Sequence, residues 1–281
     1  MIRPLTFALM IFALSACGNP PYDGEKQQRH AHMDQSFQSV LYKDNGKTVH
    51  AVTTGKSCNP AIIFIHGAPG DWKAWGRYLG DTDLRKKAFM IAVDRPGFAQ
   101  SNYGVSDVSL KSQSDQIINA ALQIHDGPFL VVGHSYGGPV QMQMAIDHAQ
   151  HLSANILLAG AIDPALHKAR WYHYAASVPP ARWMLSKPFK VTTDEMMGLH
   201  KELLSQADAL ATVEVPTKII QGGKDWLVPP ANAQFAKTAM KAADVEIISL
   251  PEQGHFIPWK EFALVKSTIL KTLPSTNNCS D

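Results

Sequence analysis

Six short apolar segments alternate with segments of helical character along most of this chain, and this alternation most limits the fold that it can adopt. Several of the six are nearly continuous in Ile, Val, Leu or Phe, as is typical of parallel strands covered on both faces. The predicted strands are Ala61–Ile65, Phe89–Val93, Phe129–Val132, Asn155–Leu158, Lys218–Ile220 and Val245–Leu250. The predicted helices are roughly Trp72–Leu79, Leu110–Ile124, Gly137–His148, Ala231–Ala239 and Phe262–Lys271. This order predicts an α/β fold with a mainly parallel sheet and helices on both faces.

An antiparallel hairpin precedes the alternation, and a helical insertion interrupts it. Phe37–Tyr42 and Thr48–Thr53 flank Asp44-Asn45-Gly46, and an Asn-Gly pair tolerates the positive φ of a tight hairpin turn. The segment from about residue 164 to residue 213 contains helical patches and several aromatic residues but no convincing strand. We interpret it as a lid over the carboxyl edge of the sheet, where ligands bind in such folds. Its aromatic side chains could equally form a core of the insertion itself.

The N-terminus has the features of an export signal. Arg3 is followed by an apolar run, Leu5 to Leu14, which is too short to cross a bilayer as a helix but suits a signal-peptide core. The run ends in Leu14-Ser15-Ala16-Cys17, which resembles a bacterial lipoprotein signal and implies removal of residues 1–16 and lipidation of Cys17. The alternative is an ordinary secretory signal with a Cys near its cleavage site. Gly18 stands where inner-membrane retention would place Asp, which favours the outer membrane, facing the periplasm, in a Gram-negative cell.

A polar tether and one large domain are predicted after the signal. Residues 17–35 are mostly polar and connect the anchor to one folded domain over residues 36–281. If Cys17 carries lipid, Cys58 and Cys279 remain as a pair in an oxidising compartment. We therefore expect a disulfide between them, with two unpaired thiols as the alternative.

Composition narrows the classes of partner. The chain has 281 residues, 45% hydrophobic and 18% charged, which suits a packed globular domain. Its formal net charge is +2 without a dense Lys/Arg run, so nothing in the charge favours nucleic-acid binding. His and Cys show no metal-ligand spacing, and we expect neither a metal nor another cofactor. The sequence leaves the oligomeric state open.

The strongest chemical motif is Gly133-His134-Ser135-Tyr136-Gly137-Gly138, which matches G-x-S-x-G. A predicted strand ends just before it and a predicted helix follows it, which is the context that a nucleophile elbow needs. The glycines permit a sharp turn that lifts the Ser135 hydroxyl off the sheet edge at a helix N-terminus. We therefore predict that Ser135 is a nucleophile.

A serine hydroxyl needs a base, and the sequence offers one with an acid after later strands. Asp225 lies in Gly222-Gly223-Lys224-Asp225, and His255 lies in Gln253-Gly254-His255-Phe256. His255 would accept the Ser135 proton and Asp225 would orient the imidazole. Asp163 is a second candidate for the acid because it also follows a predicted strand, although it could simply cap the start of the insertion.

An oxyanion hole requires two backbone N–H groups. Tyr136 follows the nucleophile and would supply one, and Ala68 in His66-Gly67-Ala68-Pro69-Gly70 would supply the other, since Pro69 has no N–H. His66 is expected to be structural, hydrogen-bonded under this loop. The remaining histidines are expected at the surface.

Together these motifs resemble the α/β-hydrolase superfamily from about Phe37 to Leu273. The resemblance implies an eight-stranded core and a catalytic triad of Ser135, Asp225 and His255. Asp94-Arg95-Pro96-Gly97-Phe98 looks like the family loop that buttresses the site, with Asp94 structural. Ala99-Gln100 departs from the family pattern, where a second glycine and a small polar residue are common.

The resemblance also limits the chemistry. Epoxide hydrolases and haloalkane dehalogenases of this fold use a carboxylate nucleophile, which Ser135 does not provide. We expect hydrolysis of an ester-type acyl bond in a small-molecule substrate, carried out by a membrane protein held through its lipid anchor. Thioesterase, aminopeptidase, acyltransferase and C–C hydrolase activities remain alternatives. A catalytically silent, lipid-anchored binding protein is a hypothesis of a different class.

Overall fold

The computed structural model describes residues 37–44 and 46–274, and eight strands form one sheet in the order β1-β2-β4-β3-β5-β6-β7-β8. The strands are β1 (Gln38–Asp44), β2 (Lys47–Thr54), β3 (Ala61–Ile65), β4 (Phe89–Val93), β5 (Phe129–His134), β6 (Leu152–Leu158), β7 (Thr217–Gly222) and β8 (Val245–Leu250). Only the two pairings that involve β2 are antiparallel. The mainly parallel, eight-stranded α/β sheet predicted from the sequence is therefore confirmed.

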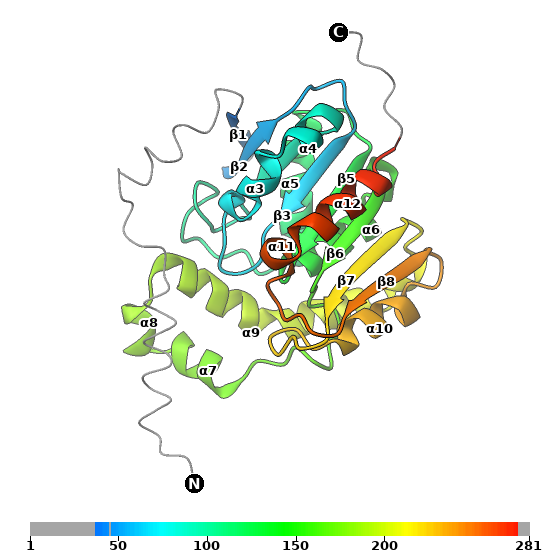
Figure 1. Cartoon of the computed structure of the whole chain (residues 1–281). Helices are drawn as coiled ribbons and strands as arrows, with labels where there is room; N and C mark the ends of the chain where they lie inside the picture. Colours follow the sequence, from blue (N-terminus) through cyan, green and yellow to red (C-terminus); the bar gives the residue numbers. More distant parts are fainter. Residues whose placement is uncertain (1–36, 45, 275–281) are drawn as a thin grey trace.

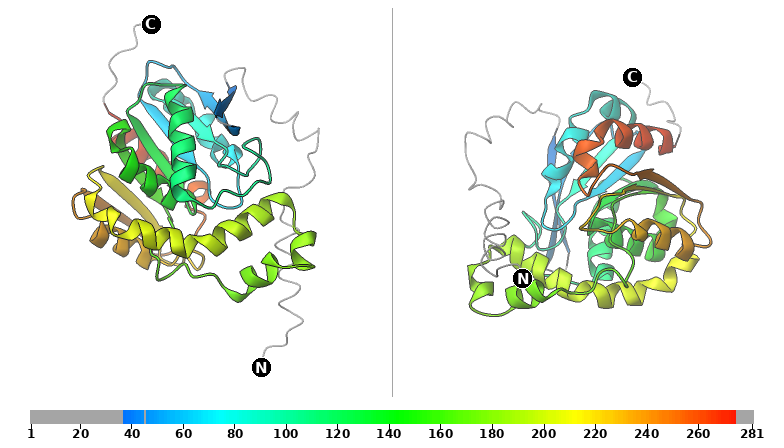
Figure 2. Two further views of the ribbon diagram at one scale, coloured as in Figure 1. Left: turned by 180° about the vertical axis from the view of Figure 1, so that it is seen from behind. Right: turned by 60° about the horizontal axis from the view of Figure 1, so that its bottom comes forward.

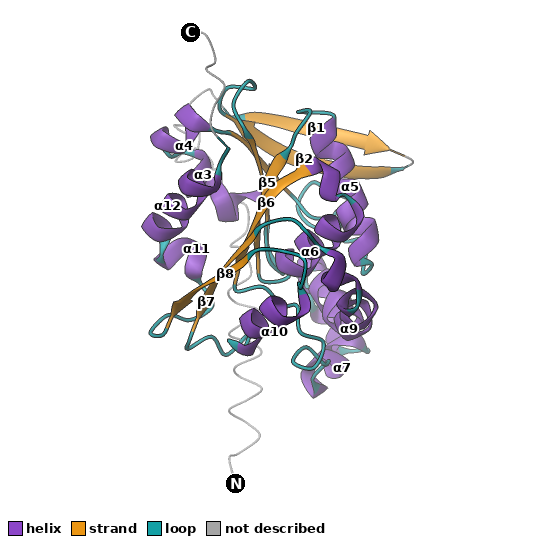
Figure 3. Cartoon of the chain, turned by 90° about the vertical axis from the view of Figure 1, so that its right-hand side faces the viewer, coloured by secondary structure: helices purple, strands orange, loops and turns teal. Residues whose placement is uncertain are grey.

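Helices cover both faces of this sheet, as Figure 3 shows. On one face lie η1 (Trp72–Trp75), α3 (Gly76–Leu79), α4 (Thr82–Lys87), α11 (Ile257–Lys260) and α12 (Phe262–Thr272). On the other lie α5 (Leu110–Leu122), α6 (Gly137–Asp147), α9 (Lys187–Ala207) and α10 (Ala231–Ala239). Two further 3-10 helices are η2 (Ala149–His151) and η3 (Ala209–Thr212).

The central strands are apolar throughout because their alternating side chains enter two separate cores. In β3, Ile63 and Ile65 pack in the core with α5 and α6, whereas Ile62 and Phe64 pack in the core with α3 and α12. All four side chains are fully buried. Burial of one such side chain is worth about 1.5–3 kcal/mol relative to exposure, which explains why no polar residue interrupts this strand.

Strand β8, at one end of the sheet, is less buried than predicted. The sequence predicts β8 as a buried strand, but only Val245 in it is buried, and Glu246 and Ser249 are exposed. This strand pairs with β7 alone and ends the sheet, so one of its edges meets solvent. An Ile-rich run does not reveal whether a strand is central or terminal, because partial burial of an edge strand also favours β-branched residues.

The connection between β6 and β7 is helical, as expected. It contains α7 (Trp171–Ser177) and α8 (Ala181–Met184), followed by α9 and η3. Figure 1 shows α7, α8 and α9 grouped together at the side of the fold where the loops after β7 and β8 also lie. In Figure 2, α7 and α8 lie outside α9, away from the sheet. No helix in the described ranges is long and apolar enough to cross a membrane.

Several predictions concern residues outside the described part of the chain. The signal peptide (1–16), Cys17 and the tether (17–35) lie there, as does Cys279. Cys58 is disulfide-bonded, and its partner also lies outside the described residues. The Cys58–Cys279 pairing therefore stays a prediction.

Candidate active site

Ser135 occupies a strained turn between β5 and α6. Its φ is +55°, a left-handed conformation that is uncommon for residues other than glycine. The turn is held by three hydrogen bonds: the Ser135 N–H donates to the Leu158 carbonyl (3.1 Å), and the Ser135 carbonyl accepts the N–H groups of Gly138 (2.9 Å) and Ala161 (3.3 Å). The Ser135 side chain is half-buried at the N-terminus of α6. This is the geometry that the G-x-S-x-G motif predicts.

Gly137 is required in this turn because another strand passes very close to it. A Cβ atom at this position would stand 2.4 Å from the carbonyl oxygen of Ile65. No side chain fits that space without a shift of the backbone of β3. The same closeness brings the loop after β3 to Ser135, since a Cβ on Gly67 would lie 3.0 Å from Ser135 Cβ.

The structure brings Asp225 and His255 together from the loops after β7 and β8. His255 Nδ1 donates to Asp225 Oδ2 at 2.8 Å, and both side chains are buried. The other carboxylate oxygen, Oδ1, accepts the backbone N–H groups of Leu227 (3.0 Å) and Val228 (2.8 Å). These bonds fix the carboxylate, and the carboxylate fixes the imidazole in the tautomer that carries its proton on Nδ1. His255 Nε2 then keeps its lone pair, as a general base requires.

His134 is a site residue that the sequence analysis missed. We expected it at the surface, but its side chain is buried, and its Nε2 donates to the backbone carbonyl of His255 at 3.0 Å. Burial, and then the neighbouring His255, lower the pKa of His134 to about 3, so the ring is neutral at physiological pH. The residue before Ser135 thus holds the backbone of the predicted base. Its place at the end of an apolar strand was the available signal of burial.

The surface prediction is wrong for His50 as well. This buried ring donates from Nδ1 to Asp94 Oδ2 at 2.7 Å. Asp94 also accepts the Trp72 N–H on Oδ1 at 2.8 Å, so it ties β2 to the segment after β3. The structural role predicted for Asp94 agrees with these contacts.

Asp163, the alternative acid, makes a different contact. Its Oδ1 accepts the Ala165 N–H at 2.8 Å, and its own N–H donates to Asn232 Oδ1 at 2.9 Å. Asp163 therefore caps a turn at the start of the insertion, whereas the contact with the His255 ring is made by Asp225.

The two candidate oxyanion donors are close to Ser135 in the chain or in space. Among the described residues, neither the Ala68 N–H nor the Tyr136 N–H is used in a hydrogen bond. Tyr136 is the N-cap of α6, where the helix dipole favours a negative charge. Both donors therefore remain available to a ligand atom.

His66 supports the loop that carries Ala68. Its Nδ1 donates to the Gly67 carbonyl at 2.6 Å, and its Nε2 accepts the Arg95 N–H at 3.0 Å. Burial, and then the Arg95 charge, lower the pKa of His66 to about 3. Both ring nitrogens take part in hydrogen bonds and the ring is neutral, in agreement with the structural role predicted for this histidine.

Arg95 is a buried centre of hydrogen bonds that sequence reasoning did not anticipate. Its Nε donates to the His66 carbonyl (2.9 Å) and its Nη2 to the Gly67 carbonyl (3.1 Å). Its Nη1 lies 2.5 Å from Glu195 Oε1, and the guanidinium carbon lies 4.6 Å from the centre of the Tyr136 ring. Arg95 thus joins the Ala68 loop, the residue after Ser135, and the insertion.

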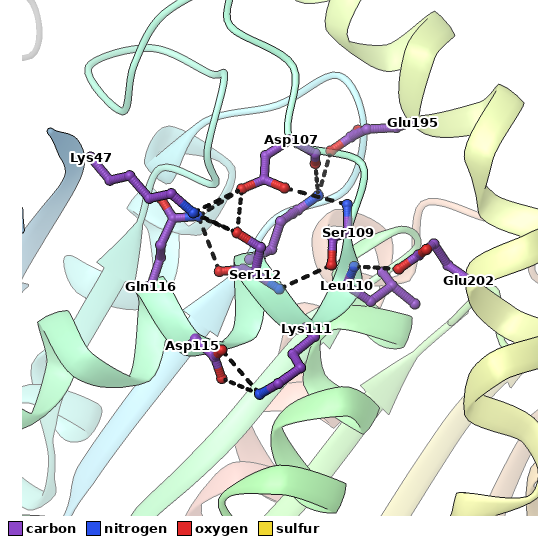
Figure 4. Close-up of polar contacts among 11 residues, drawn as sticks. Lys47, Asp107, Ser109, Leu110, Lys111, Ser112, Asp115, Gln116, Glu195 and Glu202 are labelled. Atoms are coloured by element: carbon purple, nitrogen blue, oxygen red, sulfur yellow. Dashed lines mark hydrogen bonds and ion pairs between the residues drawn. The ribbon is translucent and has the colours of Figure 1, made fainter. Parts of the chain in front are cut away.

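Glu195 lies on α9 and is fully buried beside Arg95. Burial raises the pKa of its carboxyl group, and the Arg95 charge opposes this shift. Glu202, two turns further along α9, accepts the Leu110 N–H at 2.9 Å. Figure 4 shows both carboxylates reaching from α9 to the region where α5 begins, so the insertion is tied to the core by polar contacts.

A polar hollow of about 390 Å³ lies between the β1–β2 hairpin and α5. Two of its lining residues are bonded to each other, since Lys47 Nζ donates to Ser112 Oγ at 2.7 Å, and Ser112 Oγ donates in turn to Asp107 Oδ2, outside the lining, at 2.6 Å (Figure 4). None of the predicted site residues lines it, and we assign no ligand to it. In the described part of the chain, no three His, Cys, Asp or Glu side chains are grouped so as to hold a metal ion.

A comparison of the sequence with known protein families agrees with this geometry. The model of a family described as "Alpha/beta hydrolase family" matches residues 62–264, which is most of the chain. The chain belongs to the alpha/beta hydrolase family. This match contains the Ser135 turn, Asp225 and His255, and it agrees with the resemblance found in the sequence motifs.

Individual relatives are distant. The AB hydrolase superfamily protein YfhM of Bacillus subtilis is 29% identical, over 82% of this chain and 95% of its own length. Epoxide hydrolase 3 of Xenopus tropicalis is 25% identical, over 80% of this chain and 66% of its own. Among solved structures, Cfl2 of Burkholderia cenocepacia superposes with a TM-score of 0.70 at 14% identity, over 85% of this chain and 96% of that one. The last comparison shows the shared fold.

Proposed function

We propose that this alpha/beta hydrolase is a serine hydrolase that cleaves an ester-type acyl bond in a small-molecule substrate. The observation that carries the proposal is the strained Ser135 turn at the N-terminus of α6, together with an imidazole held by Asp225, the His255 ring, whose centre lies 4.8 Å from that of His134, the residue before Ser135. A strained residue at a helix N-terminus is a common feature of functional sites, and here it bears a hydroxyl group. A lone pair on His255 Nε2 gives that hydroxyl a base.

The reaction takes place in two halves. Ser135 Oγ attacks the acyl carbon while His255 Nε2 accepts its proton, and the carbonyl π electrons move onto oxygen. The N–H groups of Ala68 and Tyr136 stabilise this oxyanion, and Asp225 stabilises the imidazolium. The oxyanion collapses, the C–O bond to the leaving group breaks, and His255 returns the proton to the departing alkoxide. Water then repeats the sequence on the acyl-serine, releasing the acid and the free serine.

Serine chemistry is favoured over the activity named for one relative. Epoxide hydrolase 3 is similar in sequence, but the elbow of this chain carries a hydroxyl in place of the carboxylate nucleophile expected for epoxide opening. A serine also permits thioester or amide hydrolysis and acyl transfer. The choice of an ester keeps the expectation drawn from the sequence, in which the aromatic residues of the insertion suit a partly apolar acyl group. In the structure the aromatic residues of α7 and α8 are not buried.

The test compares wild type, Ser135→Ala and a matched control, Ser205→Ala, against acyl esters of increasing chain length. Ser205 is exposed on α9, so its loss should not affect turnover. Ser135→Ala should abolish nearly all hydrolysis while keeping the circular dichroism of the wild type. Retained turnover in a folded Ser135→Ala variant would refute the mechanism.

We further propose that Cys17 carries lipid and holds the protein in the cell envelope. The support is the sequence alone: an apolar run of signal-peptide length directly before Leu14-Ser15-Ala16-Cys17. Cys17→Ser should move the protein from the membrane fraction to the soluble fraction. Unchanged partition between the two fractions would rule out the anchor.

A further inference from the structure

The insertion contains a segment whose charge differs from that of the rest of the chain. Residues 164–190 contain five Lys or Arg residues and no Asp or Glu, although the whole chain carries a formal net charge of only +2. Three of the five, Lys168, Arg170 and Lys190, form no ion pair among the described residues. Arg182 is paired with Asp194 at 2.8 Å, and Lys187 lies 5.1 Å from the centre of the Tyr103 ring. The segment therefore presents uncompensated positive charge.

The same segment exposes large apolar side chains. Helices α7 and α8 contain no buried residue, although they are rich in aromatics. Trp183 and Met184 on α8 are 73% and 72% exposed, and Trp171 on α7 is 62% exposed. Trp and Tyr side chains favour the boundary between water and lipid, where the ring is buried and its polar group stays hydrated. Together with unpaired cations, such residues are typical of helices that lie on an anionic membrane surface.

This surface lies at the side of the fold where the loops that carry Asp225 and His255 also lie (Figure 1). The chain passes Ser135 just before it enters the insertion, since the Ala161 N–H donates to the Ser135 carbonyl at 3.3 Å. Two further exposed aromatics flank the predicted triad in the chain, Trp226 after Asp225 (69% exposed) and Phe256 after His255 (52% exposed). The exposed apolar side chains therefore occur on the insertion and on both loops that carry the acid and the base.

We propose that α7, α8 and the basic segment around them dock the protein on an anionic lipid surface, with the active site facing the lipid. The docking itself does not depend on the proposed function. Its consequence, that an acyl substrate reaches Ser135 from the membrane, rests on the proposed function. The charge of residues 164–190 complements anionic headgroups, and the exposed aromatics enter the interface between headgroups and acyl chains. The chain before residue 37 would permit this arrangement, because about 20 residues between Cys17 and Phe37 span at most about 70 Å when extended.

The experiment uses the full chain with Cys17→Ser, so that no attached lipid contributes to binding. Partition is measured by sedimentation with vesicles of equal parts phosphatidylglycerol and phosphatidylcholine, and with vesicles of phosphatidylcholine alone. We expect clear binding to the anionic vesicles, weakened by added salt. Lys168→Gln with Arg170→Gln should lower the partition coefficient about 30-fold, since each cation near such a surface contributes about fivefold. Trp183→Ala with Met184→Ala should lower it by at least about tenfold.

Matched controls lie on distant elements. Lys86→Gln with Lys87→Gln removes two exposed cations on α4, and Leu41→Ala removes an exposed apolar side chain on β1. Neither control should change partition. Equal losses in the controls and the insertion variants, or equal binding to both vesicle types, would overturn the proposal. Concentration-dependent dimerisation without vesicles that is abolished by Trp183→Ala would also overturn it, because the surface would then serve a second copy of the chain.

Failure of this proposal can be distinguished from failure of the proposed function. Ser135→Ala should bind anionic vesicles as the wild type does, and Lys168→Gln with Arg170→Gln should hydrolyse a water-soluble ester at the wild-type rate. Hydrolysis without vesicle binding would refute the docking surface alone. Vesicle binding without hydrolysis would refute the proposed function and leave the docking surface in place.

Discussion

Neutralising Glu195 should destabilise the fold strongly, because its partner would be left as an unpaired buried cation. Arg95 and Glu195 are both fully buried, and they meet through two contacts, Nη1 to Oε1 at 2.5 Å and Nη2 to Oε2 at 3.2 Å. Removing one member of a buried ion pair costs about 3–5 kcal/mol. Glu195→Gln keeps the shape of the side chain and removes its charge, so the cost isolates the electrostatic contribution.

Urea denaturation measures this cost. With a slope of about 3 kcal/mol per molar urea, a loss of 3–5 kcal/mol lowers the midpoint by about 1–2 M at unchanged slope. Glu202→Gln is the matched control, because Glu202 lies on the same helix, is only half-buried and accepts a backbone N–H that an amide can still satisfy. The control should lose less than about 1 kcal/mol.

A thermodynamic cycle identifies the cause. In an Arg95→Met background no buried cation remains, so Glu195→Gln should cost less than about 1 kcal/mol there. An equal cost of Glu195→Gln in both backgrounds would refute the account, because the loss would then come from packing and not from the charge on Arg95.

Three further outcomes follow from the site. The free energy of unfolding should fall as the pH drops from about 6.5 to 3, because the pKa values of His66 and His134 are lowered to about 3 and the unfolded chain binds more protons in that pH range. Each ring contributes up to about 1.4 kcal/mol per pH unit. His134→Asn should therefore flatten the dependence of the urea midpoint on pH, and an unchanged dependence would contradict this. Asp225→Asn should lower kcat by about 10⁴-fold with the fold intact, because the His255 imidazole is no longer held in the tautomer that carries its proton on Nδ1. A loss below tenfold would argue for another acid. Gly137→Ala should lower the free energy of unfolding by more than about 3 kcal/mol. Gly76→Ala is the control and should not lower it, because a Cβ added there meets nothing within 4 Å. Equal stability of the two variants would contradict the close approach of Gly137 to β3.

The fold could be predicted largely from apolar runs. Ala61–Ile65, Phe89–Val93 and Val245–Leu250 have the bounds predicted for them, because Gly, Pro or charged residues stand near their ends. The layering also follows from the sequence, since strand–helix alternation allows few other arrangements. The position of β8 at the sheet edge could not be predicted, because strand order depends on contacts between distant segments.

In the candidate site, the sequence predicts the local geometry that one short motif determines, while the catalytic roles of Ser135, Asp225 and His255 stay a prediction. Ser135 has the backbone geometry that its motif demands, and Asp225 and His255 meet although 30 residues separate them, because both follow adjacent parallel strands. The Arg95–Glu195 pair joins residues 100 positions apart, and no local pattern marks either as the partner of the other. Buried polar pairs of this kind are set by the tertiary fold, so they could be found only in the structure.

The central claim, that Ser135 is an activated nucleophile, is tested most directly by labelling with a fluorophosphonate probe. Wild type and Ser135→Ala are treated side by side, and the adduct is mapped to a peptide by mass spectrometry. We predict a single adduct on Ser135 that is absent in the variant and that weakens in Asp225→Asn. A folded wild-type protein that forms no adduct, or one that is labelled equally with and without Ser135, would contradict the account.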